Sequence, residues 1–239
     1  MGFGWSLPQR RPTPHWMRIA AGGAALLLSS MSLAQQVDLG QTVAMNGTAA
    51  GVAACVACHG MKGEGDMVGG FPRIAGLSRS YLEAQLNAYA HGQRQSFLMT
   101  TPARLLTPQE RSAVAAYFSR LPPYLPPQPI AIDESAQPSD VGPWLANRGR
   151  WNQNLPACAQ CHGATGLGVG AAFPALTGQA ASYIALQLHQ WQEGKRPSGP
   201  MGLMSLVAGK LSDNDIAAVA AYYGGPDSGI QQTVAGVRK

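Results

Sequence analysis

The sequence carries little charge, few aromatic residues and only four cysteines in 239 residues. Charged side chains make up 12% of the chain and aromatic side chains 7%. Lysine and arginine are not gathered into the basic stripe that nucleic-acid binding requires, so we expect no nucleic-acid partner. Nor does any apolar run reach the ~20 residues of a membrane-spanning helix. With 46% apolar residues and 29 glycines, the composition is that of a globular protein.

An export signal is predicted over residues 1–34. Three arginines precede an apolar run at 19–33, and a small-residue cleavage site ends at Ala34. The run has 15 residues, which favours cleavage over an uncleaved N-terminal anchor. Removing the three arginines leaves 14 Lys and Arg against 12 Asp and Glu, so the formal charge falls from +5 to +2. We expect residues 35–239 to be a soluble periplasmic protein without a transmembrane segment.

The four cysteines form two pairs of identical pattern, each followed directly by a histidine. The two motifs are Cys55-Val56-Ala57-Cys58-His59 and Cys158-Ala159-Gln160-Cys161-His162. In the pattern C-x-x-C-H the two thiols bond to the vinyl groups of one porphyrin, and the histidine ligates the iron from below. The sequence therefore predicts two covalently bound haem c groups.

Other uses of paired cysteines fit this spacing less well. A zinc ribbon has its two C-x-x-C pairs roughly 15 to 20 residues apart. Here 100 residues separate Cys58 from Cys158. A thioredoxin-like redox pair or a structural disulfide explains the cysteines, but neither explains a histidine directly after both pairs.

An internal duplication extends well beyond the cysteines. Six features of the first half recur 102 residues later in the second. Phe71-Pro72, Gly76, Ser80-Tyr81, Gln85-Leu86, Gly92 and Arg94 match Phe173-Pro174, Gly178, Ser182-Tyr183, Gln187-Leu188, Gly194 and Arg196. The chain is therefore expected to contain two tandem domains of the same fold.

A proline-rich stretch lies between the two halves. Residues 121–143 hold seven of the 18 prolines and show no helical period. This composition predicts a stiff, extended linker at 123–142. It would separate a first domain at 35–122 from a second domain at 143–239.

Each half is predicted to consist of helices and loops. In the first half, Ser80 and Glu83 form a potential capping box ahead of a helical apolar period that ends at Gly92, and the second half repeats this period. The last helix of each half is expected to begin after Thr107 and Ser212. Alternating apolar and polar runs are nearly absent, so the predicted fold is all-α.

Two methionines are candidates for the second axial ligand of each iron. Met99 and Met204 occur at equal spacing, seven residues before Leu106 and Leu211, in segments that we expect to be irregular. A soft thioether sulfur suits haem iron. The histidines of the mature chain outside the two motifs have no counterpart in the other half. Met201 remains the alternative in the second half, because three extra residues precede Met204 there.

The combined motifs resemble the cytochrome c4 family of di-haem class I cytochromes. Each C-x-x-C-H-G site is followed by Phe-Pro, a Gly, a Tyr-x-x-x-Gln-Leu helix, a Gly-x-Arg and a late Met. The resemblance covers nearly all of residues 35–239, although haem subunits of several periplasmic dehydrogenases carry related tandem domains. It implies two cytochrome c folds packed about a pseudo-two-fold axis, with the haem propionates facing the interface.

The resemblance also implies roles for two prolines. Pro72 and Pro174 match the family position whose backbone carbonyl accepts a hydrogen bond from Nδ1 of the axial histidine, His59 or His162. The alternative is an ordinary turn proline. The two halves differ directly after these prolines, where Arg73 is matched by Ala175. This difference implies unequal propionate environments.

Electron transfer is the function that this ligand set predicts. An iron closed by His and Met has no open position for a substrate, so we expect no enzyme activity. The resemblance implies a carrier that relays electrons from a membrane quinol–cytochrome c oxidoreductase to a terminal oxidase. Two alternatives are an electron-transfer subunit of a periplasmic dehydrogenase and a di-haem enzyme, such as a peroxidase or a thiosulfate-oxidising cytochrome. The enzyme requires an open iron or an additional cysteine ligand, and all four cysteines are already used.

Overall fold

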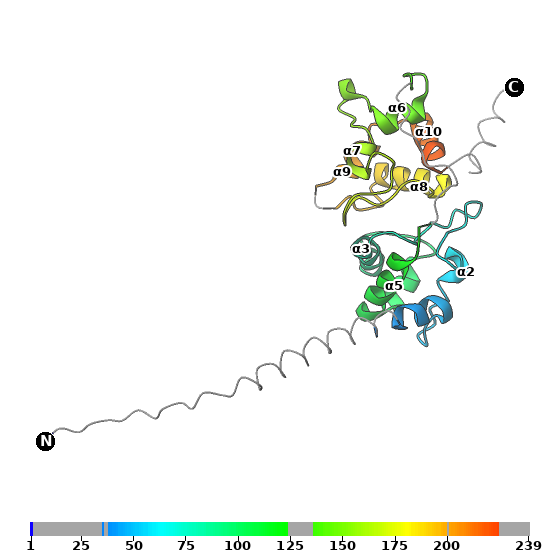
Figure 1. Cartoon of the computed structure of the whole chain (residues 1–239), viewed down its shortest axis with the longest axis vertical. Helices are drawn as coiled ribbons and strands as arrows, with labels where there is room; N and C mark the ends of the chain where they lie inside the picture. The colour runs from blue at the N-terminus through cyan, green and yellow to red at the C-terminus, as the bar shows by residue number, and fades with distance from the viewer. Residues whose placement is uncertain (2–34, 36–37, 124–135, 200, 225–239) are drawn as a thin grey trace, which may run out of the picture.

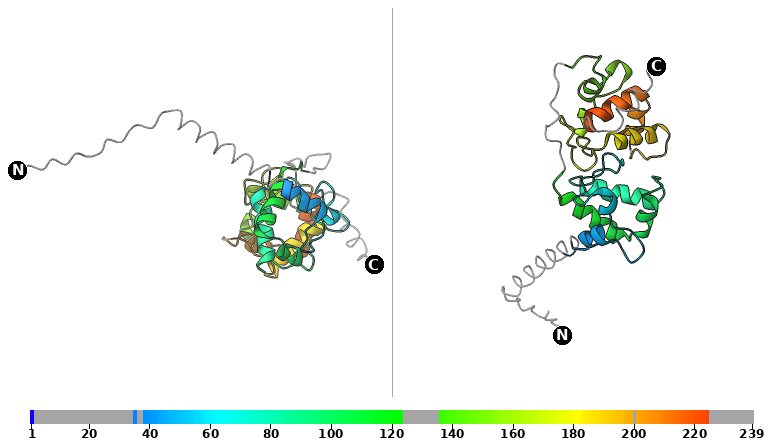
Figure 2. Two further views of the ribbon diagram at one scale, coloured as in Figure 1. Left: turned by 90° about the horizontal axis from the view of Figure 1, so that it is seen from below. Right: turned by 90° about the vertical axis from the view of Figure 1, so that its right-hand side faces the viewer.

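Two helical lobes are stacked end to end in the computed structural model (Figure 1; Figure 2, right). The structure describes residues 1, 35, 38–123, 136–199 and 201–224. The predicted signal at 2–34, and residues 124–135 of the predicted linker, lie outside the described residues. The helix α6 already begins at Val141, inside the predicted linker.

The helices of the first lobe recur in the same order in the second. The first lobe contains a helix at 38–46 and then α2 (Val56–His59), α3 (Arg79–Ala90), α4 (Thr100–Leu105) and α5 (Pro108–Arg120). The second lobe contains α6 (Val141–Asn147), a 3-10 turn η1 (Trp151–Gln153), α7 (Ala159–His162), α8 (Ala181–Gln192), α9 (Leu203–Ala208) and α10 (Asp213–Gly224). The described residues contain three isolated β-bridges and no strand. The predicted all-α fold with an internal duplication is confirmed.

In each lobe the last helix packs against the first at a glycine. A Cβ atom at Gly40 would lie 2.2 Å from the carbonyl oxygen of Ala113 on α5. At Gly142 on α6 it would lie 2.6 Å from the carbonyl oxygen of Ala218 on α10. Real Cβ atoms do not approach backbone this closely, so the crossing requires glycine at both positions. Each lobe closes its own apolar core around this crossing.

The helix caps agree with the sequence in two places and differ in one. Thr107 and Glu110 form a reciprocal capping box at the start of α5, as their spacing suggests. At α10 the Asp215 N–H donates to the Ser212 hydroxyl over 3.2 Å. The predicted capping box at Ser80 is wrong, because α3 begins earlier and Ser78 is its N-cap, accepting from the Tyr81 N–H. Ser78 has the extended backbone that a cap requires, whereas Ser80 is already helical.

None of the helices within the described ranges combines the length and apolarity that crossing a bilayer requires.

Candidate functional site

Each C-x-x-C-H motif folds as one short helical turn. Cys55 is the N-cap of α2 and Cys158 the N-cap of α7, and each turn ends at the histidine. Residues three apart lie on the same side of a helix, so the two sulfurs of each pair can reach one ligand. The cysteines are free thiols, not disulfides. Among the described residues no three His, Cys, Asp or Glu side chains are grouped so that they could hold a metal ion.

The two histidines are buried and oriented in the same way. His59 and His162 are each 7% exposed. The Nδ1 of His59 lies 2.8 Å from the carbonyl oxygen of Pro72, and the Nδ1 of His162 lies 2.8 Å from that of Pro174. Because a carbonyl only accepts, Nδ1 carries the proton and Nε2 keeps its lone pair for a metal. Burial lowers the pKa of both imidazoles, which favours this neutral form.

Two residues with hydroxyl side chains, one before and one after, flank each candidate methionine ligand, and we call each such pair a bracket. In the first lobe the Met99 N–H donates to the Ser96 hydroxyl over 3.1 Å, and the Ser96 N–H donates to the Thr100 hydroxyl over 3.0 Å. In the second lobe Ser198 and Ser205 are hydrogen-bonded through their hydroxyls, and the Ser205 N–H donates to Ser198 over 2.8 Å. The first pair is four residues apart and the second seven. The three extra residues therefore fall inside the second bracket.

This bracket distinguishes Met204 from Met201. Met204 directly precedes Ser205, as Met99 directly precedes Thr100, and it packs against the core of the second lobe. Met201 lies three residues earlier, is not adjacent to either serine and is 74% exposed. The expected irregular segment is found only for Met99, which caps α4, whereas Met204 lies inside α9.

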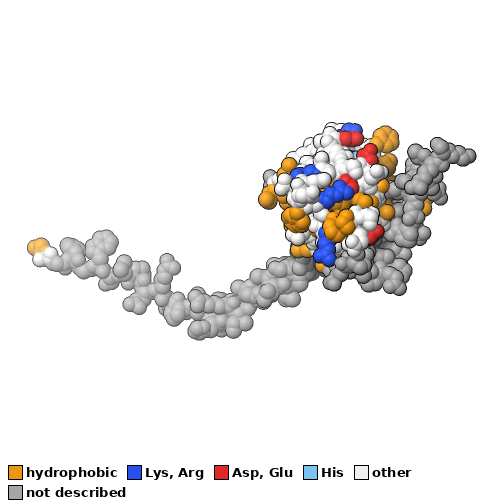
Figure 3. Space-filling view, turned by 90° about the horizontal axis from the view of Figure 1, so that it is seen from above, with side chains coloured by type: hydrophobic (Ala, Val, Ile, Leu, Met, Phe, Trp, Pro, Cys, Tyr) orange, Lys and Arg blue, Asp and Glu red, His pale blue; other side chains and the backbone are white. Residues whose placement is uncertain are grey.

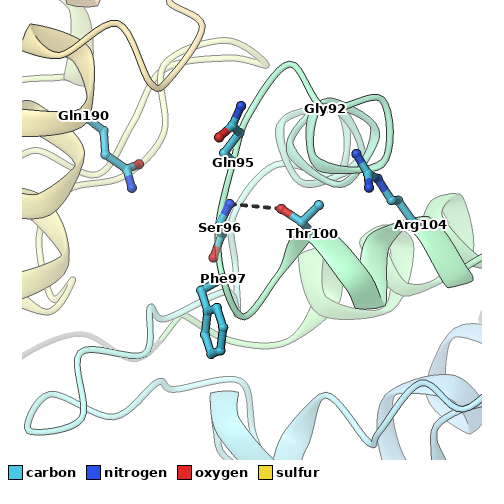
Figure 4. A pocket seen from close by; sticks show the side chains of 7 residues that line it. All are labelled: Gly92, Gln95, Ser96, Phe97, Thr100, Arg104 and Gln190. Carbon is cyan, nitrogen blue, oxygen red and sulfur yellow. Dashed lines mark hydrogen bonds between the residues drawn. The ribbon is translucent and has the colours of Figure 1, made fainter.

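An open pocket of about 510 Å³ borders the loop that carries Met99 (Figure 4). Gln190 of α8 faces this loop from the second lobe, and the Ser96–Thr100 hydrogen bond supports the near wall. The lining residues are Gly92, Gln95, Ser96, Phe97, Thr100, Arg104 and Gln190. No cysteine, histidine or methionine of the candidate site lines it, so this pocket is not the haem site.

The chain resembles known proteins along both halves. The family model Cytochrome c matches residues 37–122 and 153–223. A thiosulfate dehydrogenase electron acceptor from Stutzerimonas stutzeri is 40% identical over 209 residues, which covers 87% of this chain and 94% of that protein. A crystal structure of reduced recombinant cytochrome c4 from Pseudomonas stutzeri superposes with a TM-score of 0.66 at 34% identity, covering 79% of this chain and 97% of that one.

The chain belongs to the cytochrome c4 family. This confirms the resemblance that the sequence motifs suggest. A solved thiosulfate dehydrogenase from Marichromatium purpuratum also superposes on this cytochrome, with a TM-score of 0.70 and 40% identity. The match covers 79% of this chain but only 40% of the length of that chain. As a member of the cytochrome c family, the protein transfers electrons and binds haem c covalently.

Three buried arginines support a fit to haem. Arg73, Arg94 and Arg196 are at most 5% exposed, and the Nε of each has no hydrogen-bond partner among the described residues. None of the ion pairs in the described part of the chain includes them. A buried cation without a counter-charge is costly. The carboxylates of haem propionates, which the family resemblance orients toward the interface, would supply that charge.

Arg94 reaches from the first lobe into the second. Its Nη1 donates to Gln85 of its own lobe over 2.7 Å. Its Nη2 donates across the interface to the Tyr183 hydroxyl over 2.9 Å and to the Gln187 side-chain oxygen. The guanidinium also stacks 4.5 Å from the centre of the Tyr89 ring.

Arg196 makes the corresponding contacts in the opposite direction. Its Nη1 donates to Gln187 of its own lobe over 3.0 Å, and its Nη2 donates to the Tyr81 hydroxyl of the first lobe over 2.9 Å. A longer bond of 3.4 Å joins Nη2 to Gln85. Helices α3 and α8 therefore face each other through one network in which each glutamine serves both arginines (Figure 1).

A second contact across the interface has no symmetric counterpart. The side-chain amide of Gln179 accepts from the Arg73 N–H over 2.8 Å and donates to the Arg73 carbonyl over 3.0 Å. The Arg73 guanidinium donates to the carbonyl of Thr177 over 3.2 Å. Burial lowers the pKa of Arg73 to about 10, which leaves it protonated near neutral pH. In the repeat, Ala175 corresponds to Arg73 and Leu77 corresponds to Gln179, so the same contact cannot form a second time.

Sequence analysis missed the role of the interface residues. The tyrosines, glutamines and arginines are visible as repeated residues, but a repeat does not show that they contact the other half. A polar residue repeated on the apolar side of a helix, such as Gln187 beside Leu188, is the signal that could have indicated it. Gln179, which is not repeated, gave no such signal.

The outer end of the second lobe shows side chains of both charges. Lysine and arginine lie among acidic and hydrophobic side chains rather than in a patch of one sign (Figure 3). This mixture agrees with the small formal charge of residues 35–239 and does not favour a strongly charged partner at this end.

Proposed function

We propose that this cytochrome is an exported, periplasmic relay with two haem c groups, which accepts electrons from a thiosulfate dehydrogenase and passes them to a respiratory partner. The observation that carries the proposal is the 40% identity to a thiosulfate dehydrogenase electron acceptor over 94% of that protein. The cytochrome c4 structure matches at 34%. This proposal favours the dehydrogenase-associated alternative of the sequence analysis.

Ten residues of this chain would hold the two groups. The thiols of Cys55 and Cys58, and of Cys158 and Cys161, would form the thioether bonds. The Nε2 atoms of His59 and His162 and the sulfurs of Met99 and Met204 would ligate the irons, and the carbonyls of Pro72 and Pro174 hold the histidines. When bound, haem c supplies one-electron iron chemistry.

The local hydrogen bonds of two acids argue against a peroxidase. Glu64 and Asp66 are the acids just downstream of the first motif. The Glu64 carboxylate accepts from the Lys62 N–H over 2.7 Å, and Asp66 accepts from the N–H groups of Val68 and Gly69, both over 2.9 Å. Both acids accept hydrogen bonds within their own turns, and the second half has no acid between His162 and Phe173, so no acid pair is shared by the two sites.

A second candidate is a diffusible carrier between a quinol–cytochrome c oxidoreductase and a terminal oxidase. The observation in its favour is the near-complete match, 97%, to the length of the cytochrome c4 structure. The two candidates share the same haem sites and differ only in the electron donor.

Mixing the oxidised protein with possible donors in a stopped-flow instrument tests the proposal. With purified thiosulfate dehydrogenase and thiosulfate, we expect both haems to be reduced at a rate that rises with dehydrogenase concentration. Thiosulfate alone should reduce neither, and carbon monoxide should not bind to the reduced protein. If only the quinol–cytochrome c oxidoreductase reduces the protein, the second candidate, the diffusible carrier, is correct. Reduction by thiosulfate alone, or rapid carbon monoxide binding, would support an enzyme.

Intact-mass spectrometry of the exported protein tests the number of haems and the cleavage site. We expect the mass of residues 35–239 plus two haems, because both motifs have the same pattern and local geometry. A mass with one haem, or with residues 1–34 retained, would contradict this part of the proposal.

A further inference from the structure

The last helix of each lobe places an aromatic ring at an equivalent position. Phe118 on α5 and Tyr223 on α10 are both 3% exposed. Their backbone carbonyls accept from Gly76 and Gly178, in both cases over 3.0 Å. A tyrosine precedes each of them, with ring centres 5.1 Å apart in the first lobe and 5.0 Å in the second. The two positions therefore differ by a single hydroxyl group.

Each ring belongs to the cluster against which the first cysteine of its motif packs. Phe118 shares a core with Cys55, and Tyr223 shares the other core with Cys158. Each ring also lies against the glycine of the loop that follows the motif, so a Cβ on Gly63 or Gly166 would come within 2.9 or 2.6 Å of ring carbons. The two lobes therefore surround the first cysteine of each motif with equivalent residues.

The additional hydroxyl lies beside the Cys158 thiol but forms no hydrogen bond of ordinary distance and angle. The Tyr223 oxygen is buried and unpaired among the described residues. The Cys158 thiol points to the carbonyl oxygen of Leu145, 3.7 Å away. Burial raises the pKa of that thiol to about 11, and the neighbouring Tyr223 hydroxyl offsets part of the rise. A buried hydroxyl without a partner is costly, so its presence requires an explanation.

Haem attachment turns the neighbouring thiol into a sulfur that carries no proton of its own. When the Cys158 thiol adds to a vinyl group, the S–H bond breaks, a C–S bond forms and the proton adds to the other vinyl carbon, with no net oxidation or reduction. The sulfur then has lone pairs and no proton, so it can only accept. Tyr223 is the neighbouring hydroxyl that can donate to it.

We propose that the Tyr223 hydroxyl donates a hydrogen bond to the thioether sulfur of Cys158 and thereby raises the reduction potential of the second haem. The inference rests on the proposed attachment of haem at both motifs. A donor at the sulfur withdraws electron density from the porphyrin edge and stabilises the electron-richer, reduced state. Phe118 has no such donor, so the first haem lacks this contribution.

The size of the effect follows from the weakness of sulfur as an acceptor. One neutral hydrogen bond to a weak acceptor corresponds to a change of about threefold to tenfold in the equilibrium constant for electron exchange between the two haems. This is about 30 to 60 mV for a one-electron couple. Arg73 is matched by Ala175 in the second half, so the two halves differ in more than this hydroxyl, and the test compares variants rather than the two haems of one protein.

Redox titration of the haem-loaded protein tests the proposal with three variants. Tyr223→Phe should lower one of the two reduction steps by the stated amount and leave the other unchanged. Phe118→Tyr should raise the other step. Tyr222→Phe is the matched control, because it removes a hydroxyl from the same helix that is bonded to Asn147 over 3.0 Å, and it should shift neither step.

Two outcomes would overturn the inference. In the first, Tyr223→Phe leaves both steps in place; in the second, it shifts both equally, which is a packing effect. Resonance Raman spectroscopy provides a second measurement that does not depend on the Phe118→Tyr variant. The C–S stretching band of the second thioether should move in Tyr223→Phe. Intact mass separates the two proposals: a variant with one haem reports failed attachment, and two haems with unchanged potentials reports a failed hydrogen bond.

Discussion

A single backbone oxygen orients the histidine of each C-x-x-C-H motif, and it belongs to proline. The sequence predicts this pairing through the family pattern, and the two bonds of 2.8 Å have equal length. Each carbonyl accepts from Nδ1 and thereby fixes the orientation of the imidazole ring. The methionines are harder to predict, because their loops differ in length. The sequence places three extra residues before Met204, and the Ser198–Ser205 hydrogen bonds agree with that position.

Replacing the methionines tests this assignment. Met99→Ala and Met204→Ala should each remove about half of the near-infrared sulfur-to-iron absorption and lower one reduction potential, because methionine raises the potential of haem iron. Both haems should remain attached. Met201→Ala is the control and should change neither spectrum nor potential. An effect of Met201→Ala, with none from Met204→Ala, would reverse the assignment.

An ion pair of the second lobe provides a test of pH dependence. Asp215 is 7% exposed in its side chain and accepts from Arg150 over 2.6 and 2.8 Å. Hydrogen bonding to Arg150 lowers the pKa of this carboxyl. Its contribution to stability is therefore present above the unfolded pKa of about 3.9 and is lost as pH falls through the lower, folded pKa.

Asp215→Asn should accordingly lower the free energy of unfolding near pH 7 by about 1–3 kcal/mol. The difference from the unmodified protein should shrink as the solution is acidified below about pH 4. Denaturant unfolding at several pH values measures this. A difference that is constant with pH would show that the carboxylate charge does not contribute.

At the scale of elements, the sequence predicts the long helices and misses the short ones. The apolar periods of α3, α5, α8 and α10 are readable because each helix has at least 12 residues, and the caps of α5 and α10 are readable as well. The helices α2, α4, α7 and α9 have four to six residues, which is too short for a period. Their formation depends on packing that only the folded lobe supplies.

The helix crossing at Gly40 is a test at this scale. Gly40→Ala should destabilise the first lobe by about 1–3 kcal/mol, because the new methyl group overlaps the carbonyl of Ala113. Gly142→Ala should have a similar but smaller effect in the second lobe, where the overlap is less severe. Thermal unfolding of the haem-loaded protein, followed by circular dichroism, measures both. Unchanged melting in both variants would mean that the helices can move apart at no cost.

At the scale of the whole molecule, the duplication predicts two equal domains but not how they meet. Repetition gives Arg94 and Arg196 equivalent surroundings within their own lobes, each with a glutamine and an aromatic ring. It does not indicate that each contacts the tyrosine of the other lobe, because that contact depends on the relative orientation of the lobes. The pseudo-two-fold packing came only from the family resemblance.

The interface network yields a prediction about cooperativity. Tyr81→Phe and Tyr183→Phe each remove one hydrogen bond between the lobes and should each cost about 1–2 kcal/mol of stability. The double variant should lose an amount different from the sum, because both bonds belong to the network through Gln85 and Gln187. Denaturant unfolding of the four proteins measures the coupling. Strict additivity would contradict a shared network.

The reciprocal arginine–tyrosine contacts have the form of an isologous interface, in which residue i of one subunit contacts residue j of its twin and the reverse. In a homodimer every substitution appears on both sides at once. Joining the two halves in one chain removes that constraint, so one copy can change alone. The Arg73–Gln179 contact, which the repeat replaces with Ala175 and Leu77, is an asymmetry that only a fused chain can encode.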